Sequence, residues 1–188
     1  MRNVFSMDLY RMMKTKSTYI LLAIYVAFLS LAIFVFKTNM DAGFTIGEQT
    51  QTISEFMYYM LSGNTTIFLI IIFIAMFINA EFNSGYFKNI MGDIPNKVNY
   101  VASKCMIVAL YTAIYVIVGV VIAIIGARVL GIEELGKVSS IAAYAGILYL
   151  LDFVVGIIMI MVTIALRNSA VSRRQAQLKI TFEALSLL

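Results

Sequence analysis

The sequence predicts an all-α, polytopic membrane protein with four transmembrane helices and an N-terminal amphipathic helix at the membrane interface. Two observations carry this prediction. Of the 188 residues, 62% are apolar and 13% are charged, whereas a typical soluble domain is about half apolar and about a quarter charged. The apolar residues are also gathered into four long runs, and most of the lysines and arginines lie on one side of these runs. Lipid is therefore the expected solvent of the chain.

The four predicted spans cover residues 19–36, about 64–80, 105–127 and about 141–166. The first contains eighteen residues without a charge, and at 1.5 Å per residue it reaches about 27 Å, close to the thickness of the hydrocarbon core. No small-residue cleavage site follows this first span, so we expect a retained anchor and not a signal peptide.

The placement of lysine and arginine predicts the orientation of the spans. Residues 1–17, 81–104 and 167–188 contain eleven of these cations, and the two remaining loops contain three. Because cytoplasmic loops carry the excess of Lys and Arg, we expect a multi-pass protein of the plasma membrane with both termini in the cytoplasm. The predicted units are an interfacial helix at 1–17, a four-span bundle at 18–166 with a cytoplasmic loop at 81–104, and a basic cytoplasmic tail at 167–188.

Several functional classes lose support from residues that the sequence lacks. The chain contains no histidine and a single cysteine, Cys105, which argues against His-based catalytic triads and an intrachain disulfide. It has no P-loop and no zinc-protease or nucleophile-elbow motif. We therefore expect no catalytic residues, no cofactor and no metal site. The formal charge of +4 is explained by the membrane orientation, so no nucleic-acid partner is expected.

The first seventeen residues have the pattern of an amphipathic helix. Four apolar side chains fall on one face at helical spacing, with Arg11 and Lys14 expected to face away. The apolar set is Phe5, Leu9, Met12 and Met13. Such a helix is expected to lie at the membrane surface with its cations near anionic headgroups, although the cytoplasmic flank of any first span tends to be basic.

Two further patterns have both structural and functional interpretations. Residues 53–61 are aromatic and apolar enough to rest on the outer leaflet, with Tyr58 and Tyr59 as interface anchors; a substrate lip is the alternative. Small residues four apart permit close helix approach, although Gly and Ala are common in all membrane helices. These pairs are Ala109/Ala113, Gly119/Ala123 and Ala142/Gly146.

Asp152 stands near the middle of the fourth predicted span. An acidic residue at this depth costs about 2.5–3.5 kcal/mol on insertion scales, so its side chain must face the bundle, a subunit interface or a wet cavity. A functional role predicts contact with a cationic substrate group or with a proton. A structural role predicts a hydrogen bond to a hydroxyl such as that of Tyr149 or Thr163, or a carboxyl group that is protonated at neutral pH.

The loop at 81–104 is the most informative part of the sequence. Its first half is a helix candidate rich in apolar and aromatic residues, and Pro95 ends it. Apolar side chains on a loop outside the membrane need a cover, either lipid headgroups or a partner protein. The notable residues of the loop are Glu81, Phe82, Gly85, Lys88, Asn89, Pro95, Tyr100, Ser103 and Lys104.

This arrangement resembles the first cytoplasmic loop in permease subunits of bacterial ABC transporters of the type-two exporter class, which includes drug, peptide and bacteriocin-immunity exporters. The order Glu-Phe-x-x-Gly, Lys-Asn, Pro and Tyr-x-x-Ser-Lys lies between the second and third spans, as in that family. The resemblance covers the chain to about residue 166. It implies that the loop contains a coupling helix that docks on a separate ATP-binding subunit.

The resemblance also implies a mechanism and a set of partners. ATP-driven movement of the ATP-binding subunit would move the loop, and the spans would convey that movement to an outward path. Glu81 would position the loop and Gly85 would allow close backbone approach, while the apolar residues fill the partner's groove. The implied contact residues are Glu81, Phe82, Gly85, Tyr86, Phe87, Lys88, Ile90 and Met91. A second permease copy, identical or not, and the lipid bilayer are the other expected partners.

The sequence departs from the resembled family in its number of spans. Permeases of this class usually have six, and only four are predicted here, so we expect either a shortened family member or a chain whose C-terminal third is missing. An alternative function follows from this departure: a membrane interaction protein, such as an immunity or regulatory factor, that uses a permease scaffold without transport. An ATP-binding-cassette protein in a neighbouring reading frame would favour the permease.

Overall fold

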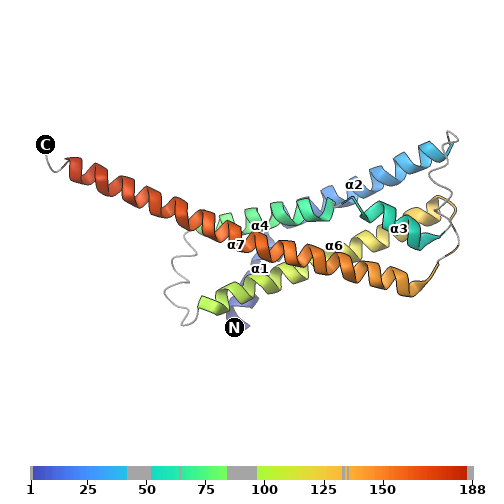
Figure 1. Cartoon of the computed structure of the whole chain (residues 1–188), viewed down its shortest axis with the longest axis horizontal. Helices are drawn as coiled ribbons and strands as arrows, with labels where there is room; N and C mark the ends of the chain where they lie inside the picture. The colour runs from blue at the N-terminus through green and yellow to red at the C-terminus, as the bar shows by residue number, and fades with distance from the viewer. Residues whose placement is uncertain are drawn as a thin grey trace.

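Six α-helices make up the described part of the chain in the computed structural model (Figure 1). The structure describes residues 2–41, 52–63, 65–83, 97–132, 134 and 136–185, and within these it contains no strand. The helices are α1 (Arg2–Lys14), α2 (Lys16–Asp41), α3 (Ile53–Leu61), α4 (Thr65–Asn83), α6 (Lys97–Val129) and α7 (Val138–Leu185). The predicted all-α fold is confirmed.

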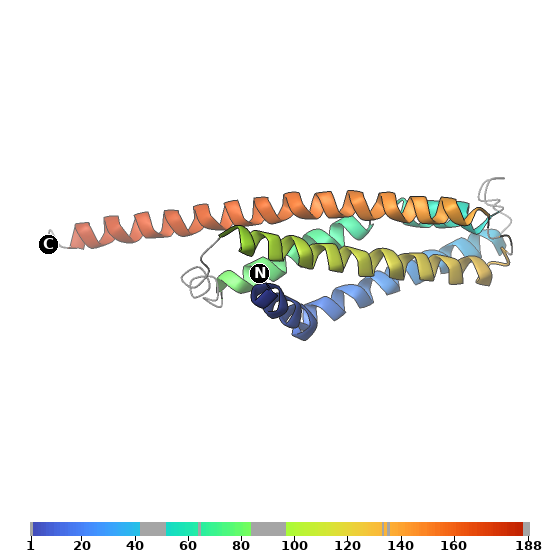
Figure 2. The ribbon, with the colours of Figure 1, turned by 90° about the horizontal axis from the view of Figure 1, so that it is seen from below.

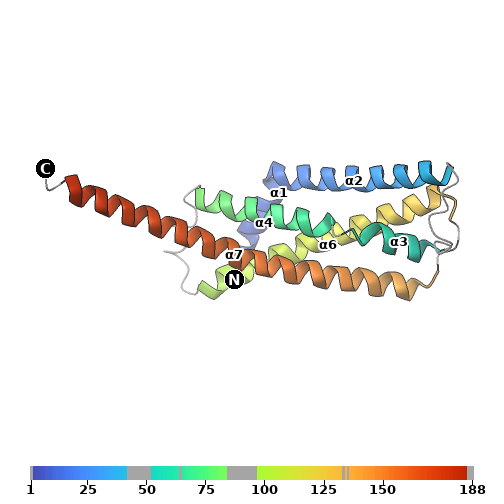
Figure 3. The same cartoon turned by 45° about the horizontal axis from the view of Figure 1, so that its top comes forward.

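Four of these helices are long and apolar enough to cross a membrane. The qualifying segments are Lys16–Asn39, Thr65–Phe82, Val98–Val129 and Val138–Leu166, and each contains most or all of one predicted span. Figure 3 shows α2, α4, α6 and α7 running side by side. Many large apolar side chains on these helices remain exposed, as expected of a bundle whose outer surface faces lipid.

The first helix is short and meets α2 at a sharp angle (Figure 2). Thr15 separates the two helices, and its hydroxyl donates to the backbone oxygen of Arg11. Helix α1 packs against α6 through a face that includes Asp8 and Met12, both buried. The predicted N-terminal helix is therefore present, and it is attached to the bundle.

Helix α3 lies in line with α4, alongside α6 and α7 (Figure 3). Its apolar face is buried against these helices, so the prediction that this segment rests on the outer leaflet is wrong for that face. Tyr58 and Tyr59 remain exposed, and their role as interface anchors stays a prediction. The buried side chains are Ile53, Phe56, Met57, Met60 and Leu61. Together α3 and α4 form a span-like unit interrupted after Leu61.

One of the small-residue pairs lies at a close helix contact. A Cβ atom on Gly119 of α6 would collide with the Tyr25 hydroxyl of α2, and Ala123, one turn later, is fully buried. Gly146 has open space where its Cβ would be. Close approach is therefore the role of the Gly119/Ala123 pair, and Gly146 has no such role within the described residues.

Helices α6 and α7 both extend beyond the predicted spans. Helix α6 begins at Lys97, so the second part of the predicted loop at 81–104 is helical. Polar residues at 97–104 lower the local hydropathy, which hides this extension from a hydropathy-based prediction. Helix α7 continues to Leu185, and at 1.5 Å per residue its 48 residues reach about 72 Å. Its C-terminal part runs well past the other helices (Figure 1).

Candidate functional site

A cluster of charged side chains lies where α1, the end of α4 and the start of α6 meet. It contains two carboxylates and two cations, with two hydroxyl groups that donate to the carboxylates. Its members are Asp8 and Arg11 of α1, Glu81 of α4, and Tyr100, Ser103 and Lys104 of α6. We call these six residues the ion-pair cluster.

Lys104 is the central cation of the ion-pair cluster. Its side chain is 2% exposed, and its Nζ lies 2.7 Å from Asp8 Oδ1 and also pairs with Glu81 Oε1. A buried ammonium is tolerated only when opposite charges and hydrogen bonds replace its lost hydration. Two carboxylates from two different helices provide that compensation.

Glu81 is fully buried in the last turns of α4. Arg11 and Lys104 both donate to its Oε1, and the Tyr100 hydroxyl donates to its Oε2 at 2.6 Å. Glu81 thereby holds one group from α1 and two from α6. The carboxylate is a fixed junction among three helices.

Asp8 is the matching carboxylate on α1. Ser103 donates its hydroxyl to Asp8 Oδ2 at 2.6 Å, and Arg11 lies 3.6 Å from Asp8 Oδ1 on the next helical turn. With Lys104 on the same Oδ1, both oxygens of Asp8 have partners. The two carboxylates and two cations balance, which lowers the cost of burying them.

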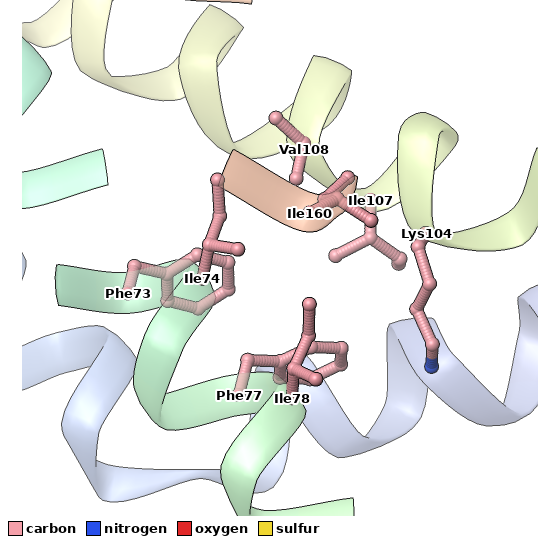
Figure 4. A pocket seen from close by; sticks show the side chains of 8 residues that line it. All are labelled: Phe73, Ile74, Phe77, Ile78, Lys104, Ile107, Val108 and Ile160. Atoms are coloured by element: carbon pink, nitrogen blue, oxygen red, sulfur yellow. The ribbon is translucent and has the colours of Figure 1, made fainter. Parts of the chain in front are cut away.

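An apolar layer lies directly beneath the ion-pair cluster. The Phe77 ring centroid is 4.9 Å from Arg11 Cζ and 5.2 Å from Lys104 Nζ, within cation–π range. Figure 4 shows Lys104 at the edge of this layer, beside side chains from α4, α6 and α7. The void among these side chains measures about 10 Å³, so it holds no ligand larger than a water molecule.

Helical spacing explains why these residues meet. Asp8 and Arg11 are three residues apart, and Tyr100 and Lys104 are four apart, so each pair occupies one face of its helix. The interpretation of Arg11 as facing away from the apolar side is wrong, because its guanidinium reaches Glu81. The electrostatic attraction of the buried Glu81 carboxylate outweighs the hydration that the partly exposed Arg11 guanidinium loses.

Two of the eight predicted partner-contact residues lie in the described part of the chain. Glu81 belongs to the ion-pair cluster, and Phe82 lines an open groove of about 430 Å³ between α4 and α7. The other six lie outside the described residues: Gly85, Tyr86, Phe87, Lys88, Ile90 and Met91.

The pairing within the ion-pair cluster was not predicted from the sequence. The loop motif contains Tyr100, Ser103 and Lys104 but does not indicate their partners, and it does not include Asp8. The sequence does contain a feature that predicts ion pairs here, because acidic residues next to a predicted span require cationic partners at the same depth. The sequence alone does not tell which cation meets which carboxylate.

Asp152 is buried in the bundle, at 1% exposure. The Thr66 hydroxyl of α4 is hydrogen-bonded to its carboxylate, while Asp152 Oδ2 has no partner. Of the two hydroxyls expected from the sequence, that of Thr163 donates to the Met159 oxygen at 2.7 Å, and the ring of Tyr149 stacks with that of Phe153. Asp152 therefore faces α4 from α7.

The four apolar helices define a multi-pass membrane protein. A family model of ABC-2 family transporter proteins matches residues 10–177, nearly the whole chain, and the chain belongs to this family. The family consists of membrane transport subunits, so its match supports the expectation that the chain is a permease subunit of an ABC transporter. No curated protein and no solved structure matches the chain.

Proposed function

We propose that the chain is the membrane-spanning permease subunit of an ATP-driven exporter, and that it couples a separate ATP-binding subunit to the movement of a substrate. It would act in the plasma membrane with both termini in the cytoplasm and together with a second permease copy. The family membership supports the permease class. We further propose that transport is directed outward and that the chain is coupled to an ATP-binding partner.

The observation that carries the coupling is the position of the ion-pair cluster. Glu81 lies just before residues 84–96, and Tyr100 and Lys104 lie just after them in the chain. The cluster therefore ties both ends of this segment to each other and to α1.

A rigid base of this kind favours transmission of force. A force that a partner exerts on residues 84–96 would be transmitted to α4, α6 and α1 together, because the buried ion pairs resist separation of the three helices. Without such a base, the same force would be absorbed by local rearrangement of the segment. ATP binding and hydrolysis would take place in the partner chain.

The test replaces two apolar residues of the segment by aspartate, Phe87→Asp with Ile90→Asp. Burial of a Phe-sized side chain is worth about 1.5–3 kcal/mol, so the double variant should lose co-purification of the ATP-binding subunit and its membrane-stimulated ATPase activity. Gly85→Val should weaken both, because it adds bulk at an expected close backbone approach.

The matched control is Val138→Asp, which introduces the same charge at an exposed apolar residue at the start of α7. It should leave recruitment and ATPase activity unchanged. All variants should reach the membrane in normal amounts, because residues 85–90 lie outside the spanning segments and Val138 is the terminal residue of one of them. Wild-type recruitment by the double variant would refute the coupling role and favour the non-transporting interaction protein.

A further inference from the structure

Three buried side-chain oxygens in the described part of the chain have no hydrogen-bond partner. They are Asp152 Oδ2 of α7, the Tyr25 hydroxyl of α2 and the Thr112 hydroxyl of α6. Each of these residues is at most 1% exposed. Because an unsatisfied buried polar atom is costly, such atoms indicate a missing partner.

Two of these residues are coupled to each other. The Tyr25 side chain interacts electrostatically with the Asp152 carboxylate, and Tyr144 of α7 does so as well. The Tyr25 ring also lies 4.9 Å from the Tyr115 ring of α6. The hydroxyl of Tyr25 occupies space that exists only because residue 119 is glycine. Side chains from α2, α4 and α7 thus surround the carboxylate with polar groups that are not charged.

The apolar segments of the four spanning helices contain no cation that could pair with Asp152. Residues 17–36, 65–80, 105–127 and 138–166 contain no lysine, arginine or histidine, and Asp152 is the only acidic residue among them. Asp152 is fourteen residues from either end of the apolar segment Val138–Leu166, about 21 Å from each. An ionised carboxylate at this depth requires a positive partner, and these four segments do not provide one.

Burial disfavours the charged form of the Asp152 carboxylate, and the start of α4 offsets part of this cost. Thr66 is the second residue of α4, so the carboxylate that bonds its hydroxyl lies near the positive end of the α4 dipole. Helices interrupted at membrane depth place such ends toward bound ions and substrates in transport proteins, and here the interruption falls between Leu61 and Thr65. A cation bound at the carboxylate would offset the rest of the burial cost.

We propose that Asp152 and Tyr25 form an intramembrane binding site for a monovalent cationic group, most suitably the protonated amine of a small amphipathic molecule. Asp152 Oδ2 would accept from the ammonium, and the Tyr25 hydroxyl oxygen would accept a second N–H. The apolar surroundings would hold the alkyl part. The interpretation of this site as a substrate site rests on the proposed permease function. The binding of a cation at Asp152 and Tyr25 does not depend on that function.

The test measures binding to the purified full-length chain in lipid nanodiscs. Thermal unfolding is followed while hexylammonium chloride is added, with hexan-1-ol as the uncharged probe of the same chain length. At a concentration about 100 times the Kd, hexylammonium should raise the Tm by about 5–10 °C, and hexan-1-ol should give no comparable saturating shift. Equal shifts with both probes would refute the proposal.

Two variants locate the effect. Asp152→Asn should abolish the shift, and Tyr25→Phe should weaken the affinity about fivefold, the loss of one modest hydrogen bond. Glu134→Gln makes the same carboxylate-to-amide change at an exposed position and should keep the full shift. If Asp152→Asn does not fold, Tyr25→Phe and the comparison of the two probes still decide the question.

Sodium, potassium and choline chlorides at equal concentration distinguish the sources of the cation. A shift with sodium or potassium that depends on Asp152 would assign the site to a free metal ion, and a shift with hexylammonium alone would assign it to an amine. If no cation gives a shift that depends on Asp152, the proposal is wrong. Because no ATP-binding subunit is present, this failure would leave the proposed coupling function untouched.

Discussion

At the scale of single residues, Lys104 has a large influence on the free energy of burying the ion-pair cluster. Like Arg11, it pairs with both carboxylates, but unlike Arg11 it is almost fully removed from water. A buried ion pair is often no more stabilising than an apolar replacement of the whole group, but removal of one partner is strongly destabilising. The cluster therefore specifies how the three helices are joined more than it adds to stability.

Lys104→Met should destabilise the protein by about 3–5 kcal/mol, because Asp8 and Glu81 then lose their shared cation in a buried setting. The measurement is the free energy of unfolding in detergent, together with membrane abundance. Adding Glu81→Gln to Lys104→Met should recover part of the loss, since it removes one of the two buried negative charges that Arg11 would then have to balance.

The matched control for Lys104 is Lys137→Met, the same substitution at an exposed lysine. Its effect should stay within about 0.5 kcal/mol. If Lys104 and Lys137 gave equal losses, burial of the cluster would not be the source of its importance.

At the scale of elements, the contact between α2 and α6 depends on one missing side chain. The Tyr25 hydroxyl fills the position that a Cβ on residue 119 would take. The rings of Tyr25, Tyr115 and Tyr111 continue this packing along α6. Because the clashing atom is the hydroxyl and not the ring, its removal should relieve the clash.

Gly119→Ala should lower the free energy of unfolding by about 1–3 kcal/mol through overpacking. In a Tyr25→Phe background the same substitution should cost clearly less. Gly146→Ala is the control, because its Cβ enters open space and the gain in helix propensity should make it neutral or slightly stabilising. Equal costs of Gly119→Ala in both backgrounds would show that the hydroxyl is not the limiting contact.

The elements differ in how far the sequence predicts them. The four spans follow from hydropathy, because the exclusion of charge from lipid depends on composition alone. The packing of α3 onto the bundle cannot be predicted from hydropathy, because an apolar helix of nine residues can bury its apolar side chains equally well against lipid or against protein. The direction of Arg11 was mispredicted for a related reason: a helical wheel separates apolar from charged residues but does not contain the buried Glu81 on another helix.

The candidate site was predicted only in part. Glu81 was identified through its place in the loop motif, and Asp152 through its charge within an apolar run. The partners of both came from other helices, at separations of 70 residues for Arg11 and Glu81. Contacts between residues so far apart in the chain depend on how the helices pack, which no local pattern records.

At the scale of the whole molecule, the orientation in the membrane remains a prediction from the distribution of charge. In a Cys105→Ser background, cysteines at Glu48 and Glu134 should react with an impermeant thiol reagent on intact cells. A cysteine at Asn89 should react only after permeabilisation, because the excess of lysine and arginine holds its loop in the cytoplasm. Labelling of residue 89 from outside would reverse the assigned topology.

The charge balance of the ion-pair cluster affects how firmly the molecule retains its first helix when the surrounding solution changes. A helix held at the surface by anionic lipids is released as salt screens the attraction, over a Debye length of about 8 Å at physiological ionic strength. The contacts of Asp8 and Lys104 are buried and screened much less. Helix α1 should therefore stay docked in concentrated salt and in bilayers made only of zwitterionic lipids, so that its position is set by the protein fold and not by the composition of the membrane.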